Sequence, residues 1–335
     1  MDEEESKLWE ECGELPEEIM ELAYPEECPE SEEDKQPTVE ELNIKLCITG
    51  EFRDDIMEWI AEVDPPTSRS KPNVGGLLRE ELAKAPDTRW HASHLFTRYC
   101  INIGASPASS PAVLRRCVTG RPEVVTSSDD DAAFIRDIAV ACVALTVKFH
   151  RDFLPPVQPI MADDFLLLAS KSHTLTYDDL EAAQREVLNV FSFCVGSVTP
   201  SAYMQEFWNA LPSLRGLLTQ VNAWETTKSF AWEHLKDAQY DLNHLKFPAS
   251  LLTACALMRG LVDSLVVAQK CLDQPSNPGL LPVMSDARCR CSSLRREAER
   301  KTRLVEMDLK DLLNFKKSTW EACKKWLEDC NTQEV

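Results

Sequence analysis

The chain has 335 residues, of which 44% are apolar, enough for two domains that each have their own core. No run of eighteen apolar residues occurs and the N-terminus is acidic, so we expect neither a membrane span nor a signal peptide. Of the net charge of −20, −15 falls in residues 1–48, and the remainder has no basic field that would concentrate nucleic acid. The thirteen cysteines are dispersed and follow no export signal, which favours reduced thiols inside the cell.

Residues 1–48 form an acidic tail with eighteen Asp or Glu residues and three lysines. Apolar periodicity is almost absent there, which predicts a disordered segment. Within it, residues 24–43 are rich in Pro, Glu, Ser and Thr, a composition typical of short-lived regulatory proteins. A tail that only improves solubility is an equally good interpretation.

Helical periodicity begins at Phe52 and continues to Val63, where Asp64-Pro65-Pro66 ends the helix. A short helix is predicted within 74–85, and a clearer one begins at Asp87, a plausible N-cap, and runs to residue 100. His91 and His94 have a spacing that suits a metal, but no third ligand accompanies them. We therefore expect exposed or hydrogen-bonded histidines there.

Residues 104–130 form a long insert rich in Ser, Pro and Gly. A loop of this length inside a domain is usually functional or disordered. Ser106 and Ser110 each precede a proline, which makes them candidate phosphorylation sites for proline-directed kinases. An unmodified loop is the alternative.

Two apolar segments, 137–150 and 251–261, predict buried helices at the centre of two helical units. Ala141-Cys142 in the first matches Ala254-Cys255 in the second, 113 residues later. This repetition at domain length indicates a duplicated all-α fold.

The remaining segments are also helical in pattern, and no strand is predicted. The expected helices cover 161–172, 178–193, 201–222, 224–240, 250–267 and, as one long charged region, 286–329.

The sequence lacks motifs of known enzyme chemistry: it has no phosphate-binding glycine loop, nucleophile motif or pair of Cys-x-x-Cys motifs. Cys289 and Cys291 have no second Cys/His pair at zinc spacing. We therefore expect no metal or other cofactor, and a protein that binds another protein rather than an enzyme.

Several segments, in their order along the chain, resemble the helices of one known family. FRDDIMEWIAEV at 52–63 resembles the first helix of a cyclin box, and LFTRYC at 95–100 resembles the end of the second. The apolar segment 137–150 resembles the third helix, with Lys148 at a lysine that the family keeps. Residues 174–193 resemble the fifth helix, Thr199-Pro200 the box boundary, and 224–257 the second and third helices of a second box.

The resemblance implies an all-α chain with two tandem five-helix cyclin boxes after the acidic tail. The first box would span 49–198, with inserts near 64–86 and 104–130, and the second would span 199–335. Such a chain would be a regulatory subunit that binds and activates a cyclin-dependent protein kinase in cell-cycle control. We expect a heterodimer in the nucleus and cytoplasm, without nucleic acid or membrane as a partner.

The resemblance also implies two surfaces on the first box. The kinase-binding positions correspond to Lys148, Phe149, Gln184, Leu188, Phe193 and Val195. A candidate substrate groove corresponds to Phe52, Ile56, Trp59 and Glu62, with Asp55 where an aliphatic group normally lies.

Gln184 departs from the family, which has a glutamate at this position. This departure and the inserts keep a second function open, a cyclin-like scaffold that no longer activates a kinase, as in meiotic crossover recombination. A general transcription factor of the TFIIB kind also carries two such boxes. The lack of a basic surface and of an N-terminal zinc ribbon argues against it.

Overall fold

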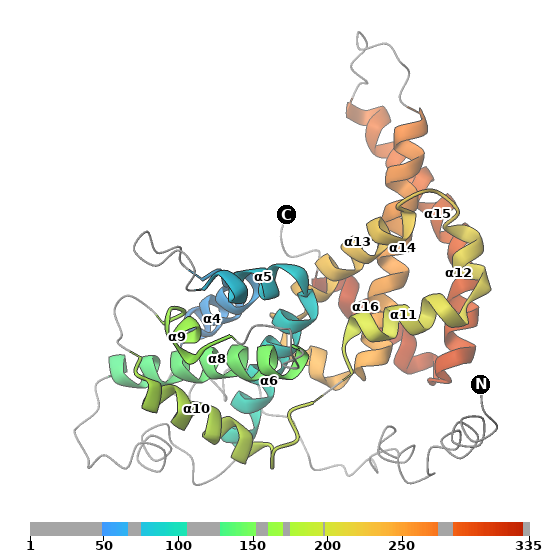
Figure 1. Cartoon of the computed structure of the whole chain (residues 1–335). Helices are drawn as coiled ribbons and strands as arrows, with labels where there is room; N and C mark the ends of the chain where they lie inside the picture. Colours follow the sequence, from blue (N-terminus) through green and yellow to red (C-terminus); the bar gives the residue numbers. More distant parts are fainter. Residues whose placement is uncertain are drawn as a thin grey trace, which may run out of the picture. The chain divides into compact units, whose positions relative to one another are not determined.

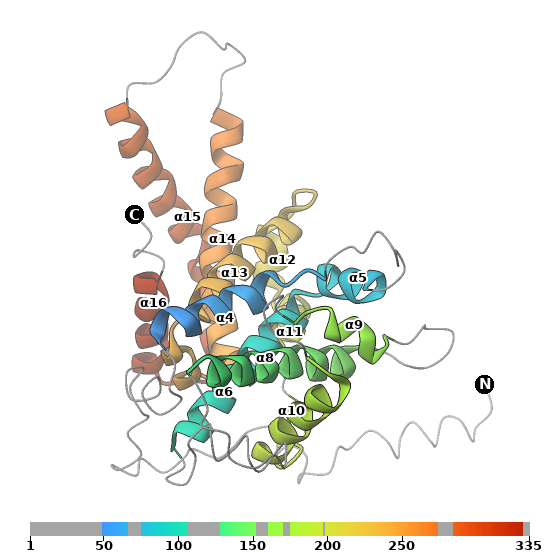
Figure 2. The ribbon, with the colours of Figure 1, turned by 90° about the vertical axis from the view of Figure 1, so that its left-hand side faces the viewer.

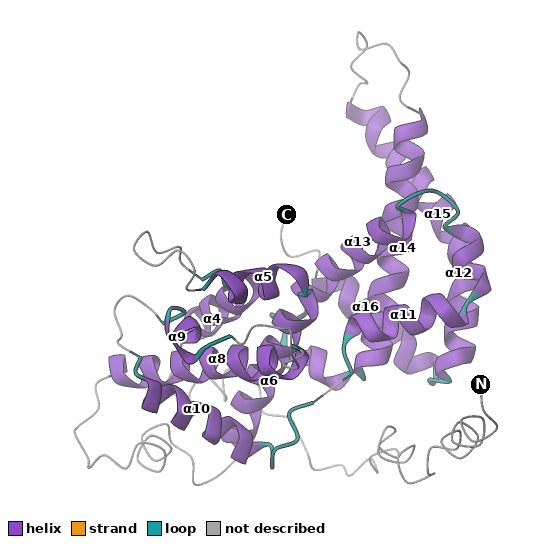
Figure 3. Ribbon diagram, in the orientation of Figure 1, coloured by secondary structure: helices purple, strands orange, loops and turns teal. Residues whose placement is uncertain are grey.

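The computed structural model describes residues 49–65, 75–105, 128–151, 160–169, 175–196, 198–273 and 284–330. These residues are helical or in loops, and they contain no strand (Figures 1 and 3). The prediction of an all-α fold is therefore confirmed. The acidic tail, residues 106–127 of the insert and both candidate phosphorylation sites lie outside the described residues.

The first group of helices packs around the apolar segment predicted at 137–150. Every side chain from Ile138 to Ala144 is buried, and α6 and α10 pack against this helix. Because its small residues leave no polar face, neighbouring helices cover it on all sides. The group consists of α4 (Gly50–Glu62), α5 (Gly76–Lys84), α6 (Pro86–Ala105), α8 (Ser128–His150), α9 (Ala162–Leu166) and α10 (Tyr177–Val190).

The second group packs in the same way around α14, the other apolar segment (Figure 2). Every side chain from Leu251 to Met258 is buried, so the prediction of a second buried central helix is also confirmed. The group consists of α11 (Pro200–Ala210), α12 (Pro212–Leu217), α13 (Ala223–Ala238), the 3-10 helix η1 (Leu242–Lys246), α14 (Ala249–Asp273), α15 (Met284–Leu313) and α16 (Lys317–Cys330).

A glycine sets the close contact between α13 and α14. A Cβ placed on Gly260 would lie 2.6 Å from the backbone nitrogen of Ala231 and 2.7 Å from the carbonyl oxygen of Thr227. These distances are far below van der Waals contact, so only glycine lets the two backbones approach this closely.

Several details differ from the sequence prediction, among them the helix expected at 161–172, of which only Ala162–Leu166 is α-helical, and the helix expected at 178–193, which ends at Val190. The helix expected at 201–222 is broken at Leu211, because Pro212 has no amide donor and starts a new helix. The region 286–329 is two helices, and Asn314, with φ of 50°, ends the first of them in the left-handed conformation that asparagine tolerates. Asp87 lies in the first turn of α6 rather than at its N-cap.

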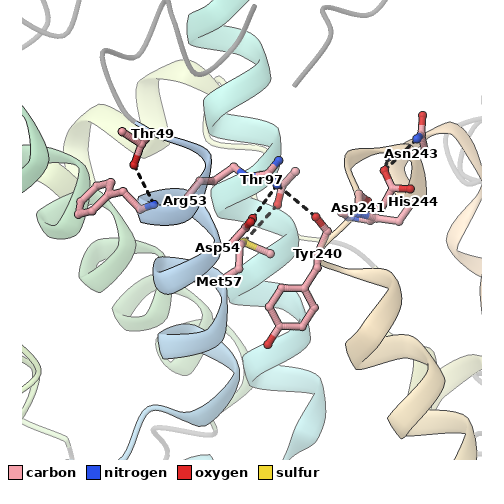
Figure 4. Close-up of polar contacts among 10 residues, drawn as sticks. Thr49, Arg53, Asp54, Met57, Thr97, Tyr240, Asp241, Asn243 and His244 are labelled. Atoms are coloured by element: carbon pink, nitrogen blue, oxygen red, sulfur yellow. Dashed lines mark hydrogen bonds and ion pairs between the residues drawn. The ribbon is translucent and has the colours of Figure 1, made fainter. Parts of the chain in front are cut away.

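Polar contacts join the first group to the second. The guanidinium of Arg53 donates to the carbonyl of Tyr240 at 3.4 Å (Figure 4), and the amide of Gln239 donates to the carbonyl of Trp90 at 2.9 Å. Asp87 accepts from the backbone N–H of Ser201 at 3.0 Å, which satisfies one of the free donors at the start of α11. Trp90 itself, although on α6, packs into the second core.

Residues 249–270 of α14 are long and apolar enough to cross a membrane by length and composition. Of this stretch, 67% is buried inside the structure, as it is in the central helix of many globular folds.

Candidate functional site

The end of α8 brings Lys148 next to α10. The ammonium group of Lys148 donates to the Oε1 atom of Gln184 at 2.6 Å, and the Nε2 atom of Gln184 donates to the carbonyl of Leu180 one turn earlier. The glutamine is thereby fixed with its oxygen toward the lysine. Lys148 and Gln184, 36 residues apart in the chain, therefore share one polar site at the surface.

Lys148 has a partner that is neutral. Among the described residues no carboxylate lies within ion-pair distance of it, although Glu181 on α10 contributes a weaker attraction. The water that the ammonium group loses to its protein surroundings outweighs that attraction and lowers the pKa of Lys148, because this loss disfavours the charged form. The ring of Phe165 lies 5.9 Å from the ammonium group. The lysine thus holds a positive charge with donors left for another acceptor.

Phe149 follows Lys148 and remains 51% exposed. Its ring lies against residue Gly196: a Cβ placed on this glycine would be 2.9 Å from the ring. Phe149 also contacts the imidazole rings of His91 and His150 edge to face, at centroid distances of 5.4 and 5.2 Å. One side of the phenyl ring is therefore fixed by protein and the other is open.

The turn after α10 presents a second exposed aromatic ring. Ser192 and Phe193 have φ angles of 48° and 65°, a left-handed conformation that costs a non-glycine residue about 1–2 kcal/mol. The N–H of Phe193 donates to the carbonyl of Leu188 at 2.7 Å, and the Phe193 side chain is 67% exposed. A strained backbone that exposes a large aromatic residue is a feature of binding sites.

Side chains of α6 contact this turn and hold it in place. The guanidinium of Arg98 lies 4.7 Å from the centroid of the Phe191 ring, and the Nε2 atom of His91 lies 2.7 Å from the carbonyl oxygen of Val195. The structure thus gathers the six predicted kinase-binding residues around one end of α8 and α10. Phe149, Phe193 and Lys148 are exposed, and Gln184, Leu188 and Val195 are partly buried.

Sequence reasoning missed two residues of this site, His91 and His150. The Nδ1 atom of His91 lies 2.9 Å from the Nε2 atom of His150. His91 is hydrogen-bonded, as we expected, but it is buried beneath Phe149. Spacing could not have found the pair, because the two histidines are 59 residues apart.

The four candidate groove residues on α4 are less accessible to a partner than Phe149 and Phe193. Ile56 is only 3% exposed and belongs to the first core, while Phe52 and Trp59 are partly buried. The guanidinium of Arg136 lies 5.1 Å from the Phe52 ring, and Glu62 pairs with Lys236 at 2.9 Å. Asp55 is exposed.

A separate cleft of about 280 Å³ lies between α14, α15 and α16. Arg259, Arg295 and Lys324 face Glu299, Glu306 and Glu328 there, so the formal charges of its lining cancel. None of the kinase-binding or groove residues predicted from the sequence lines it.

Among the described residues, no group of three or more His, Cys, Asp or Glu side chains is placed to hold a metal ion. The side chains of Cys289 and Cys291 lie outside the described part.

No protein-family model matches this chain, and no curated protein matches its sequence significantly.

Proposed function

We propose that this protein is a cyclin-like regulatory subunit that binds a cyclin-dependent protein kinase and acts in cell-cycle control. The docking surface consists of Lys148, Phe149, Gln184, Leu188, Phe193 and Val195. The observation that carries the proposal is the Lys148–Gln184 hydrogen bond at the end of a buried helix, flanked by the exposed rings of Phe149 and Phe193. The cyclin-like segments, which follow one another along the chain in the order that the family has, also support the proposal.

The chemistry of this surface suits a helix of the partner. Two exposed aromatic rings supply apolar anchors, and aromatic residues dominate the binding energy of many interfaces. Lys148 would donate charge-assisted hydrogen bonds to backbone carbonyls of the partner, each contributing about 1.5–3 kcal/mol. The arrangement fits the docking of an amphipathic helix against an apolar surface. In this proposal the catalytic residues all belong to the kinase.

One observation favours the second function, a scaffold that does not activate a kinase. Gln184 offers a neutral oxygen where the cyclin family has a carboxylate, and that oxygen already accepts from Lys148. A neutral acceptor contributes about 0.5–1.5 kcal/mol, less than a charged one. The scaffold would use the same fold in, for example, meiotic crossover recombination.

A pull-down with a panel of purified cyclin-dependent kinases, followed by a kinase assay of each complex, tests the proposal. A regulatory subunit binds one or a few kinases and raises their activity. A scaffold binds without raising activity. If the chain binds none of the kinases, the proposed function is wrong.

A further inference from the structure

The hydrogen atoms between His91 and its two partners have only one consistent arrangement. The carbonyl of Val195 can only accept, so the Nε2 atom of His91 carries a hydrogen. Burial lowers the pKa of His91 to about 4, so the ring is neutral and its Nδ1 atom is an acceptor. That atom must receive its hydrogen bond from the Nε2–H of His150. A directed chain of hydrogen bonds therefore runs from α8 through α6 to the turn at 195.

This chain of hydrogen bonds lies against the ring of Phe149. The His91 and Phe149 rings meet at 85°, and the His150 and Phe149 rings at 89°, both edge to face. The Phe149 ring also meets Gly196, directly after the residue whose carbonyl ends the chain of hydrogen bonds. The two histidines thus fix both the aromatic ring and the backbone segment that it rests on.

We infer that His91 and His150 are positioning residues of the docking surface, because their hydrogen-bonded chain holds Phe149 and Val195–Gly196 in the arrangement that a protein partner contacts. The inference rests on the proposed function for the identity of the partner, a cyclin-dependent kinase. Its structural part, the fixing of Phe149, applies to the free chain as well.

A role in the core alone would not require this arrangement. A buried histidine needs partners for its own two nitrogens, and these could come from one neighbouring element. Here the partners come from α8 and from the turn after α10, the two segments that supply the docking surface. His150 is only partly buried, so its burial alone contributes little to the stability of the core.

Two variants of His150 separate the role of the hydrogen bond from loss of the side chain. His150→Gln places an amide N–H close to the position of Nε2 and can still donate to His91. His150→Ala cannot. We expect His150→Ala to weaken binding of the best kinase in the panel about three- to tenfold, the effect of one hydrogen bond, and His150→Gln to stay within about twofold of the wild type.

NMR of the free protein labelled with ¹⁵N and ¹³C gives the second measurement. We expect both imidazoles to carry hydrogen on Nε2, and the Phe149 ring signals to shift in His150→Ala but little in His150→Gln. The inference is overturned if His91 carries its hydrogen on Nδ1, or if Phe149→Ala weakens kinase binding while His150→Ala does not.

Failure of the proposed function has a different signature. In that case the wild-type chain binds none of the kinases, or Phe149→Ala leaves the binding unchanged, and the positioning role is decided on the free chain alone. Phe149 signals that shift in His150→Ala then support it, and signals identical to the wild type overturn it.

Discussion

The contact at Gly260 gives a prediction whose size follows from the structure. In Gly260→Ala the new Cβ would lie 2.6 Å from a backbone nitrogen of α13, whereas contacting heavy atoms prefer about 3.5–4.0 Å. The atoms that it meets are backbone, so no side chain can turn away, and α13 and α14 must separate by about 1 Å. Overpacking of this kind costs about 1–3 kcal/mol, and we expect the upper end of that range.

Replacing Gly260 by alanine also has a stabilising effect. Alanine is better than glycine inside a helix by about 1 kcal/mol. We therefore expect Gly260→Ala to lower the free energy of unfolding by about 2 kcal/mol, the difference between the two effects.

Gly216 in α12 provides a matched control, because a Cβ there meets no atom within 4 Å. Gly216→Ala should raise the free energy of unfolding slightly, by at most about 0.5–1 kcal/mol. Urea titration followed by tryptophan fluorescence compares the two, and Trp320 reports on the second core. With m values of about 1–3 kcal/mol/M, their midpoints should differ by about 1 M or more. Equal midpoints would refute the close contact between α13 and α14.

Three further predictions concern acid, peptide binding and modification. Burial lowers the pKa of His94 and of His244. As the pH falls, these histidines are therefore protonated in the unfolded chain before they are protonated in the folded one. The stability that they contribute is present above about pH 6.5 and is lost below it. The Tm should fall between pH 7.5 and 5.5, and it should fall less in the double variant His94→Gln, His244→Gln. An equal fall of the Tm in both proteins would contradict the assignment of this effect to the two histidines. Peptides with an Arg-x-Leu motif should bind weakly or not at all, and micromolar binding abolished by Trp59→Ala would disprove this. Ser106 and Ser110 should be phosphorylated on co-expression with the partner kinase, which phosphopeptide mapping decides, and an unmodified insert would end the idea.

The central helices were predictable because their signal is local. Nine of the ten residues from Ile138 to Val147 are apolar, a pattern that predicts burial, and most of them are buried. The break before Pro212 was missed, although its signal is local, since a proline inside a helix removes one backbone hydrogen bond. The break at Asn314 carries a weaker signal, because asparagine is tolerated in many conformations.

The site was less predictable for a physical reason: its geometry comes from contacts distant in sequence. The placement of Lys148 and Gln184 on one surface was expected only from the family resemblance, and the hydrogen bond between them was not expected. Nothing local indicates that Phe193 adopts a left-handed backbone, because phenylalanine does not favour it. The turn is set by its anchoring to α6, through residues such as His91 that lie a hundred positions earlier.

The affinity of two single variants for a panel of cyclin-dependent kinases tests the central claim most directly. Lys148→Ala should weaken binding, because carbonyls of the partner lose their donor, and Gln184→Glu should strengthen it by less than tenfold, about 1 kcal/mol. The loss from Lys148→Ala should be the larger effect. Lys228→Ala, a change on α13 outside the docking surface, is the control and should have no effect. A tight kinase complex that is indifferent to both Lys148→Ala and Gln184→Glu would contradict the account and place the partner on another surface.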